Sequence, residues 1–295
     1  MEVIKVEQML RSIFSDIEGL KIKTVKSDTE HLLINNDSLK ALPTLLDDSI
    51  DLIITDPPYN QGLNYGPYYN DRLPWPEFYK INKVWLKEVA RILKSNGSFY
   101  LISYPEINAR LLPFIEDELG LKLRRWITWH YPTNIGHSKK NFTRSQRAIL
   151  FFTKDKKDYT FNKGSIIQPY KNPEVKRIKE KIKNGSKGRG AYDLLEVLDL
   201  VELNQYTMDV LDINLLKNVS KDRFDGKHPC QLPLGLLRIF VKASSNKNDI
   251  ILDPFAGTFT LSAVAKELGR NSVGIEINPY YIKLGIKRLK KCQDE

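Results

Sequence analysis

The stretch of ten residues from 51 to 60 limits what this chain can fold into more than any other. Residues 52–54 form a short apolar run rich in β-branched side chains, which predicts a buried strand. Two prolines follow at 57–58, and because proline has no backbone N–H to donate to a sheet, the strand must end at Asp56. A carboxylate, a rigid turn and the ring of Tyr59 therefore stand at the carboxyl end of a strand, the edge at which open α/β sheets bind ligands.

Apolar strands alternate with amphipathic helices along most of the chain, which predicts a parallel sheet covered by helices. A helix over 78–93 precedes a strand over 98–103, and a helix over 261–268 lies between strands 249–253 and 272–276. The expected fold class is α/β, with a doubly wound, mostly parallel sheet. Other local expectations are a helix over 2–18, a loop over 24–28 and a turn over 94–97.

A second motif near the other end of the chain, Ile251-Leu-Asp-Pro-Phe-Ala-Gly257, pairs with the first. Together they resemble the signatures of S-adenosylmethionine-dependent DNA amino-methyltransferases, which methylate the exocyclic amine of adenine or cytosine. The resemblance covers residues 31–290 except the middle, and it implies a Rossmann-like methyltransferase fold. The catalytic tetrad comes before the cofactor motif, the circularly permuted order called the beta class. The tetrad positions are Asp56, Pro57, Pro58 and Tyr59.

The resemblance also implies a site for S-adenosylmethionine. An acid at Asp37 would bind the adenine end of the cofactor, although an aspartate at a strand end is also an ordinary helix cap. Glu276 lies at the end of the strand after Asp253, where an acid binds both ribose hydroxyls in dinucleotide folds. The chain has no G-x-G-x-x-G, which disfavours a ligand with a pyrophosphate. The expected cofactor residues are Asp37, His228, Asp253, Phe255, Gly257, Thr258, Glu276 and Asn278.

Two segments depart from the family pattern. Phe259 stands where a small residue is usual, and its bulk could reshape the pocket for the methionine portion of the cofactor. Cys230 and Leu232 stand where Thr and Lys are usual, just before a helix expected to pack beside that portion.

Positive charge is concentrated in the middle of the chain. The net charge is +10, but residues 121–190 contain 19 Lys and Arg against 4 Asp and Glu. A segregated basic segment suits a polyanion, because each neutralised phosphate releases counterions. Without the two motifs, the charge would favour a solvated, lysine-rich surface. With them, the predicted partner is double-stranded DNA. The expected DNA contacts are Lys139, Lys140 and Arg144.

The tetrad suggests how a poor nucleophile is activated. If the Asp56 carboxylate and the Pro57 carbonyl each accept one amine hydrogen, the nitrogen moves toward sp3 geometry and its lone pair can attack the methyl group. Tyr59 would stack on the base, which must be flipped out of the duplex. An aspartate at the first position favours adenine N6 over cytosine N4. Less favoured alternatives are an RNA or protein methyltransferase and a non-catalytic nucleic-acid-binding module.

We expect four parts along the chain: an N-terminal extension (1–30), a catalytic half (31–153), a target-recognition insertion (154–226) and a cofactor-binding half (227–295). No apolar run could cross a bilayer and the first residues do not look like a signal peptide, so the expected compartment is the cytoplasm, without membrane partners. Two distant cysteines have no metal-ligand spacing, and we expect no metal. The family setting implies a cognate restriction endonuclease, and monomer and homodimer both stay open.

Overall fold

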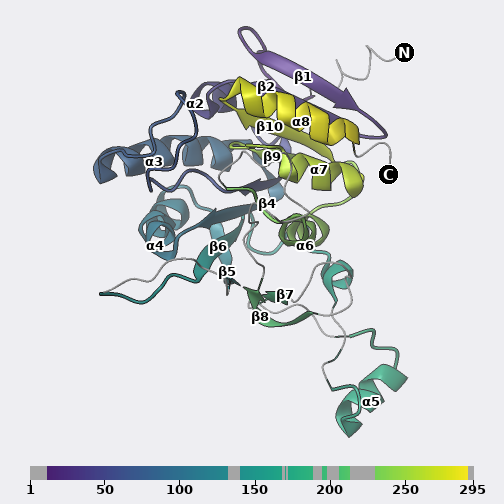
Figure 1. Cartoon of the computed structure of the whole chain (residues 1–295). Helices are drawn as coiled ribbons and strands as arrows, with labels where there is room; N and C mark the ends of the chain where they lie inside the picture. Colours follow the sequence, from purple (N-terminus) through teal and green to yellow (C-terminus); the bar gives the residue numbers. More distant parts are fainter. Residues whose placement is uncertain are drawn as a thin grey trace.

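The computed structural model describes residues 12–131, 140–167, 170, 172–188, 195–197, 206–212 and 230–291. The strands in these ranges form one sheet in the order β1-β2-β10-β9-β3-β4-β6-β5-β8-β7 (Figure 1). Their bounds are β1 Lys21–Lys26, β2 Glu30–Asn35, β3 Ile50–Thr55, β4 Leu93–Ser103, β5 Lys122–His130, β6 Gln146–Thr153, β7 Leu195–Val197, β8 Tyr206–Asp212, β9 Ile250–Asp253 and β10 Asn271–Glu276.

The five strands β2, β10, β9, β3 and β4 are parallel to one another, which confirms the predicted sheet. The tetrad strand β3 pairs directly with the cofactor-motif strand β9, with Leu52 opposite Ile251 and Ile53 opposite Leu252. Because the two strands run the same way, both motifs open at one edge of the sheet. The pairing therefore joins the two halves of the chain into one site.

Helices cover both faces of the sheet, as a doubly wound fold requires. Successive strand residues point to opposite faces, so Ile53 packs with α3, while Leu52 and Ile54 pack with α6 and α7. The first face carries α2 (Ser38–Ala41), η1 (Leu42–Thr44), α3 (Trp75–Ile92), α4 (Pro105–Pro113) and the π-helical turn η2 (Phe114–Glu118). The second carries α6 (Leu234–Ser244), α7 (Thr260–Glu267) and α8 (Pro279–Lys291).

The N-terminal helix expected over 2–18 does not reach residue 18. Residues 1–11 lie outside the described ranges, and Ile13 is the last helical residue. Phe14 instead forms an antiparallel bridge with Leu45, and both side chains are buried. The apolar residues that suggested a helical stripe therefore belong in part to an extended segment packed on η1.

Two further local expectations are wrong. The loop expected over 24–28 is largely β1, an edge strand in which Val25 is buried and the other side chains are polar or partly exposed, so its pattern is weak. The turn expected over 94–97 lies within β4. The strand begins directly after α3, because Leu93 is buried and pairs with Ile50 of β3.

Beyond β4 the strand pairing is no longer uniformly parallel. β6 is antiparallel to β4 and β5, with Ser103 opposite Ala148, so β6 starts at the edge where β3 and β4 end. After β6, Asn162 donates its backbone N–H to Ala243 of α6 over 2.6 Å, and η3 (Lys163–Ile166) follows. The lysine-rich α5 (Lys176–Lys183) buries no side chain and projects from the body in Figure 1. The boundary at 154 stays a prediction.

Within the described ranges, no helix has the length and apolar character needed to span a membrane.

Candidate active site

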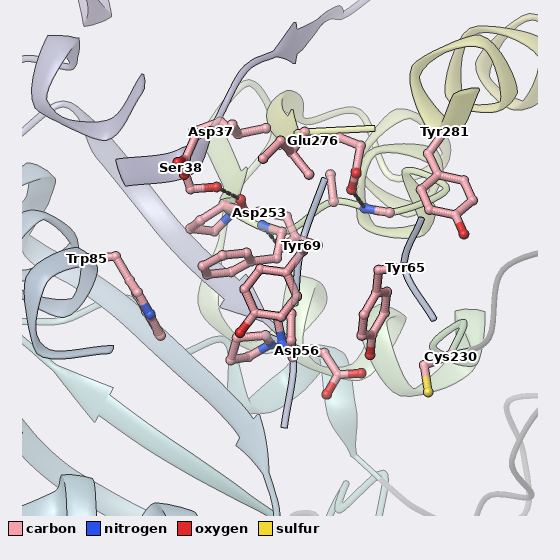
Figure 2. A pocket seen from close by; sticks show the side chains of 18 of the residues that line it. Asp37, Ser38, Asp56, Tyr65, Tyr69, Trp85, Cys230, Asp253, Glu276 and Tyr281 are labelled. Atoms are coloured by element: carbon pink, nitrogen blue, oxygen red, sulfur yellow. Dashed lines mark hydrogen bonds between the residues drawn. The ribbon is translucent and has the colours of Figure 1, made fainter. Parts of the chain in front are cut away.

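A cavity of about 330 Å³ opens at the carboxyl edge of the parallel strands. Four carboxylates line it, because β2, β3, β9 and β10 each end in or beside an acidic residue. They are Asp37, Asp56, Asp253 and Glu276. Figure 2 shows Asp37 and Glu276 at one end of the cavity and Asp56 at the other, with Asp253 between them. The structure thus brings the tetrad acid and three expected cofactor acids into one cavity.

Glu276 is positioned by backbone amides at the end of β10. Its two carboxylate oxygens accept hydrogen bonds from the N–H groups of Gly257 (2.9 Å) and Asn278 (2.8 Å). Burial raises the pKa of Glu276 to about 7, against the opposing effect of these amides. A carboxylate has about four acceptor positions, so capacity remains for two ligand hydroxyls.

Asp253 and Asp37 are held in different ways. Asp253 accepts hydrogen bonds from the Thr55 hydroxyl and the Phe255 N–H, both at 3.0 Å, and burial raises its pKa to about 7. Asp37 caps α2 by accepting from Leu39 N–H at 3.0 Å, so both functions considered for it are compatible with its place on the cavity wall. Both acids present carboxylate oxygens to the cavity.

The turn after β9 supplies backbone and apolar surface. Gly257 has φ +49°, a left-handed conformation that glycine adopts at no steric cost, and its N–H points to Glu276. Phe255 contacts Trp85 edge to face at 5.3 Å between ring centroids, and both line the cavity. Thr258 also lines it and is fixed by Arg288, which donates to the Thr258 carbonyl at 3.1 Å.

Phe259, whose bulk could have reshaped the pocket, lies away from it. It is 1% exposed, has φ +59° and is absent from the cavity wall. Its ring packs instead in a cluster of apolar side chains beneath α7 and α8, which includes Leu33, Ile282 and Leu289. The left-handed backbone turns the side chain away from the cofactor side of the turn.

The tetrad occupies the opposite end of the cavity. Asp56, Pro57 and Pro58 line it, whereas Tyr59 is 5% exposed and lies behind them. The Tyr59 hydroxyl donates a hydrogen bond to Asp56 Oδ1, and its ring centroid lies 4.7 Å from that of Tyr104. Burial raises the pKa of Asp56, while the charge of Arg147 opposes the rise. Stacking of Tyr59 on a base stays a prediction.

The loop after the tetrad is held in place by the buried side chain of Asp71. Asp71 accepts hydrogen bonds from the backbone N–H groups of residues 60, 61 and 63 at 2.8 to 3.0 Å. Asn60 adds two hydrogen bonds to the backbone of Leu73, at 2.6 and 2.8 Å. These contacts place Tyr65 and Tyr69 on the cavity wall (Figure 2).

Several residues of the site were not singled out from the sequence. Trp85 of α3 and Tyr281 of α8 both line the cavity. Arg147 is near the start of β6, and the antiparallel direction of this strand brings the Arg147 guanidinium to 3.7 Å from the Asp56 carboxylate. The sequence shows an arginine at the start of an apolar strand, and this pattern could have singled out Arg147. The direction of that strand in the sheet could not be predicted from the sequence. Cys230, noted as a departure, lines the cavity near Asp56.

Some expected residues lie elsewhere or outside the described ranges. His228 and Lys139 fall outside them. Asn278 does not line the cavity; it caps α8 and donates to the Tyr65 carbonyl at 3.3 Å. Among the expected DNA contacts, Lys140 is exposed, and Arg144 pairs with Glu106 and covers the Tyr104 ring at 3.7 Å. Their contacts with DNA stay predictions.

The donor and acceptor set suits S-adenosylmethionine. Acceptors for hydroxyl and amine groups stand at one end, aromatic and apolar walls lie in the middle, and no cluster of basic side chains is present for a phosphate among the lining residues. Among the described residues, no group of three or more His, Cys, Asp or Glu side chains could hold a metal ion.

Comparison with known proteins agrees with this geometry. Residues 50–287 match the N6/N4 methyltransferase family model, described as DNA methylase. The type II methyltransferase M.HpaI of Haemophilus parainfluenzae is 35% identical over 257 residues, covering 87% of this chain and 73% of that protein. The DNA adenine methyltransferase YhdJ of Escherichia coli (strain K12) is 34% identical over 264 residues, covering 87% and 82%.

Solved structures show the same fold at lower identity. The PvuII DNA methyltransferase, described as cytosine-N4-specific, superposes with a TM-score of 0.64 at 18% identity, covering 90% of each chain. M1.HpyAVI in complex with SAM gives 0.58 at 21% identity, covering 87% of this chain and 98% of that one. Because the family match spans both motifs and most of the sheet, the chain belongs to the N6/N4 DNA methylase family and is a DNA methyltransferase that uses S-adenosylmethionine.

Proposed function

We propose that the chain methylates the exocyclic N6 of adenine in double-stranded DNA after flipping the base out of the helix. The observation that carries this proposal is the position of Asp56, at the far end of one cavity from Asp37 and Glu276 (Figure 2). With the cofactor's adenosine at the end lined by Asp37 and Glu276, its methyl group would lie toward Asp56. The reaction then takes place between two sites built on neighbouring strands, β9 and β3.

The residues of the tetrad activate the amine by geometry. The Asp56 carboxylate and the Pro57 carbonyl each accept one amine hydrogen, which localises the nitrogen lone pair. Bound S-adenosylmethionine supplies an electrophilic methyl group on its sulfonium. As the new N–C bond forms, the bond between the methyl carbon and sulfur breaks, and its electron pair stays on sulfur, which leaves as a neutral thioether. The nitrogen becomes acidic and releases a proton, which Asp56 can accept because burial raises its pKa. Tyr59 keeps Asp56 Oδ1 in place through its hydroxyl hydrogen bond.

Adenine is favoured over cytosine by the aspartate at the first tetrad position. The relative YhdJ, described as a DNA adenine methyltransferase, supports this choice at 34% identity. The cytosine-N4-specific PvuII enzyme is 18% identical, a level that reflects the shared fold alone. Methylation of cytosine N4 remains the alternative.

We further propose a setting in the cytoplasm, in a restriction–modification system with a cognate restriction endonuclease that acts on the same site. The support is the description of M.HpaI and of M.BglII of Bacillus subtilis as type II methyltransferases, at 35% and 30% identity. The segment 154–226 would read the target sequence. Its lysine-rich α5 has no buried side chain, which leaves its surface available for DNA.

Methyl transfer from labelled S-adenosylmethionine to unmethylated genomic DNA, followed by nucleoside analysis, tests the proposal. We expect label in N6-methyladenine. Label in N4-methylcytosine would contradict the choice of base and keep the catalytic site. Label in RNA or protein but not DNA, under the same conditions, would refute the proposed substrate.

A further inference from the structure

The proposed chemistry assigns no function to a buried arginine that lies beside the tetrad. Arg147, the second residue of β6, is 7% exposed, and its guanidinium stands 3.7 Å from Asp56 Oδ2. The same guanidinium faces the rings of Tyr59 and Trp129, each at 5.1 Å to the centroid. Arg147 does not line the cavity, whereas Asp56 does.

A buried arginine needs compensation, because a guanidinium stays charged in a protein. Two aromatic faces supply part of it through the attraction between a cation and a π system. Among the described residues, Arg147 Nε has no hydrogen-bond partner, so hydrogen bonding does not account for the whole group. The Cys230 side chain hydrogen-bonds with Arg147, and Asp56 supplies a full negative charge. The side chains of Arg147 and Asp56 are 8% and 10% exposed.

We propose that Arg147 is a positioning residue that keeps Asp56 in its anionic form and fixes Tyr59 beneath it. This inference rests on the proposed function, in which Asp56 accepts a hydrogen from the target amine. Only the carboxylate form can do so with both oxygens, since a protonated carboxyl donates from one of them. Arg147 acts through Asp56 and does not touch the base.

Other titratable groups around Asp56 do not replace this cation. Tyr59 donates a hydrogen bond to it, and Asp253 is a second acid whose pKa Asp56 raises further. Burial raises the pKa of Cys230, which keeps this thiol neutral next to Arg147. Burial also raises the pKa of Tyr65, and the charges of Cys230 and Asp56 raise it further. Of these neighbours, Arg147 is the one whose charge lowers the pKa of Asp56.

The test compares wild type, Arg147→Met and Arg147→Lys. Methionine keeps much of the length and apolar volume without the charge, and lysine keeps the charge. We expect R147M to shift the acid limb of the kcat profile to higher pH, with a loss of about a hundredfold at pH 7 that recovers as pH rises. R147K should recover part of the loss. The KM and Kd for S-adenosylmethionine should stay at the wild-type values, because Arg147 does not line the cofactor cavity.

The ionisation of Asp56 can also be read without methyl transfer. In protein labelled with carbon-13 at aspartate carboxyls, the signal absent from Asp56→Asn identifies Asp56. We expect it to titrate at higher pH in R147M than in wild type, whether or not DNA is the substrate. If R147M does not fold, R147K carries both measurements, with a smaller shift in the same direction.

An acid limb and an Asp56 titration unchanged from wild type would overturn the inference. So would a loss of kcat that is equal at every pH and equal in R147M and R147K, because that pattern indicates a structural contribution alone. Failure of the wild-type protein to methylate DNA would count against the proposed function, and the carbon-13 titration would still decide the function of Arg147.

Discussion

The ring of Phe259 fills the space that a side chain on Gly274 would occupy. A Cβ placed on Gly274 would lie 2.4 Å from Phe259 Cε1, and one on Gly285 would lie 2.3 Å from Phe259 Cδ2. The large residue in the cofactor turn is therefore matched by two missing side chains, one on β10 and one on α8. This match is why Phe259 leaves the cofactor cavity unobstructed.

Gly274→Ala should destabilise the fold through this contact. The added methyl group must displace the Phe259 ring or the β10 backbone, and overpacking of this kind costs about 1–3 kcal/mol of unfolding free energy. Urea denaturation measures the change. In the double variant Gly274→Ala/Phe259→Leu, we expect a total loss smaller than the sum of the single losses, because the smaller side chain relieves the clash. Additive losses would show that the two residues are not coupled.

Asp56→Asn should remove methyl transfer and leave cofactor binding in place. The amide has the shape of the carboxylate but presents an N–H₂ donor toward the target amine, so we expect kcat to fall about 10³-fold. Calorimetry with S-adenosylmethionine is the control for the cofactor site. Asp37→Asn is the matched variant at the other end of the cavity and should weaken cofactor binding. Wild-type turnover in D56N would contradict the proposed mechanism.

Glu276 should make the cofactor-free protein less stable as pH rises. Burial raises its pKa from the ordinary value of 4.5 to about 7 in the folded protein, so the folded state holds this proton more tightly than the unfolded chain. The unfolding free energy contributed by Glu276 is therefore greatest below the unfolded pKa and declines as pH rises through about 7.

Urea denaturation at several pH values, compared between wild type and Glu276→Gln, isolates this contribution. We expect the wild type to lose more stability than the variant between pH 5 and pH 8. A constant difference between the two proteins over this range would contradict the raised pKa. Glutamine keeps the size of the side chain, and its single amide oxygen can accept one of the two hydrogen bonds from Gly257 and Asn278. Loss of the other hydrogen bond does not depend on pH, so it does not explain a pH-dependent difference.

Lys140→Ala should reduce the salt dependence of DNA binding. Lys140 is exposed in the segment leading into β6, at the edge where the tetrad opens, and losing one phosphate contact lowers the salt slope by about 1. Titrations at several salt concentrations measure the slope. Lys23→Ala is the control, since Lys23 is exposed on β1, the outermost strand on the side of the sheet away from β6. Equal slopes in both variants would remove Lys140 from the DNA surface.

Local patterns were enough to predict most of the parallel sheet and both motifs. The two prolines after Asp56 end β3 for a purely local reason, and helical periodicity located α3 and α7 within a few residues. The polar edge strand β1 and the early end of the N-terminal helix were missed. Both depend on pairing with β2 and with Leu45, which are tertiary contacts.

By itself, the sequence determined that the chain has two acid-tipped strands, Asp56 after one and Asp253 at the end of the other, because β-branched runs, prolines and glycine act over a few residues. Tertiary structure alone decided which groups surround those acids. The antiparallel direction of β6 brings Arg147 to Asp56, and the bare backbone of Gly274 lets Phe259 turn away from the cavity. Strand direction and side-chain packing depend on residues far apart in the chain, so no short-range pattern contains them.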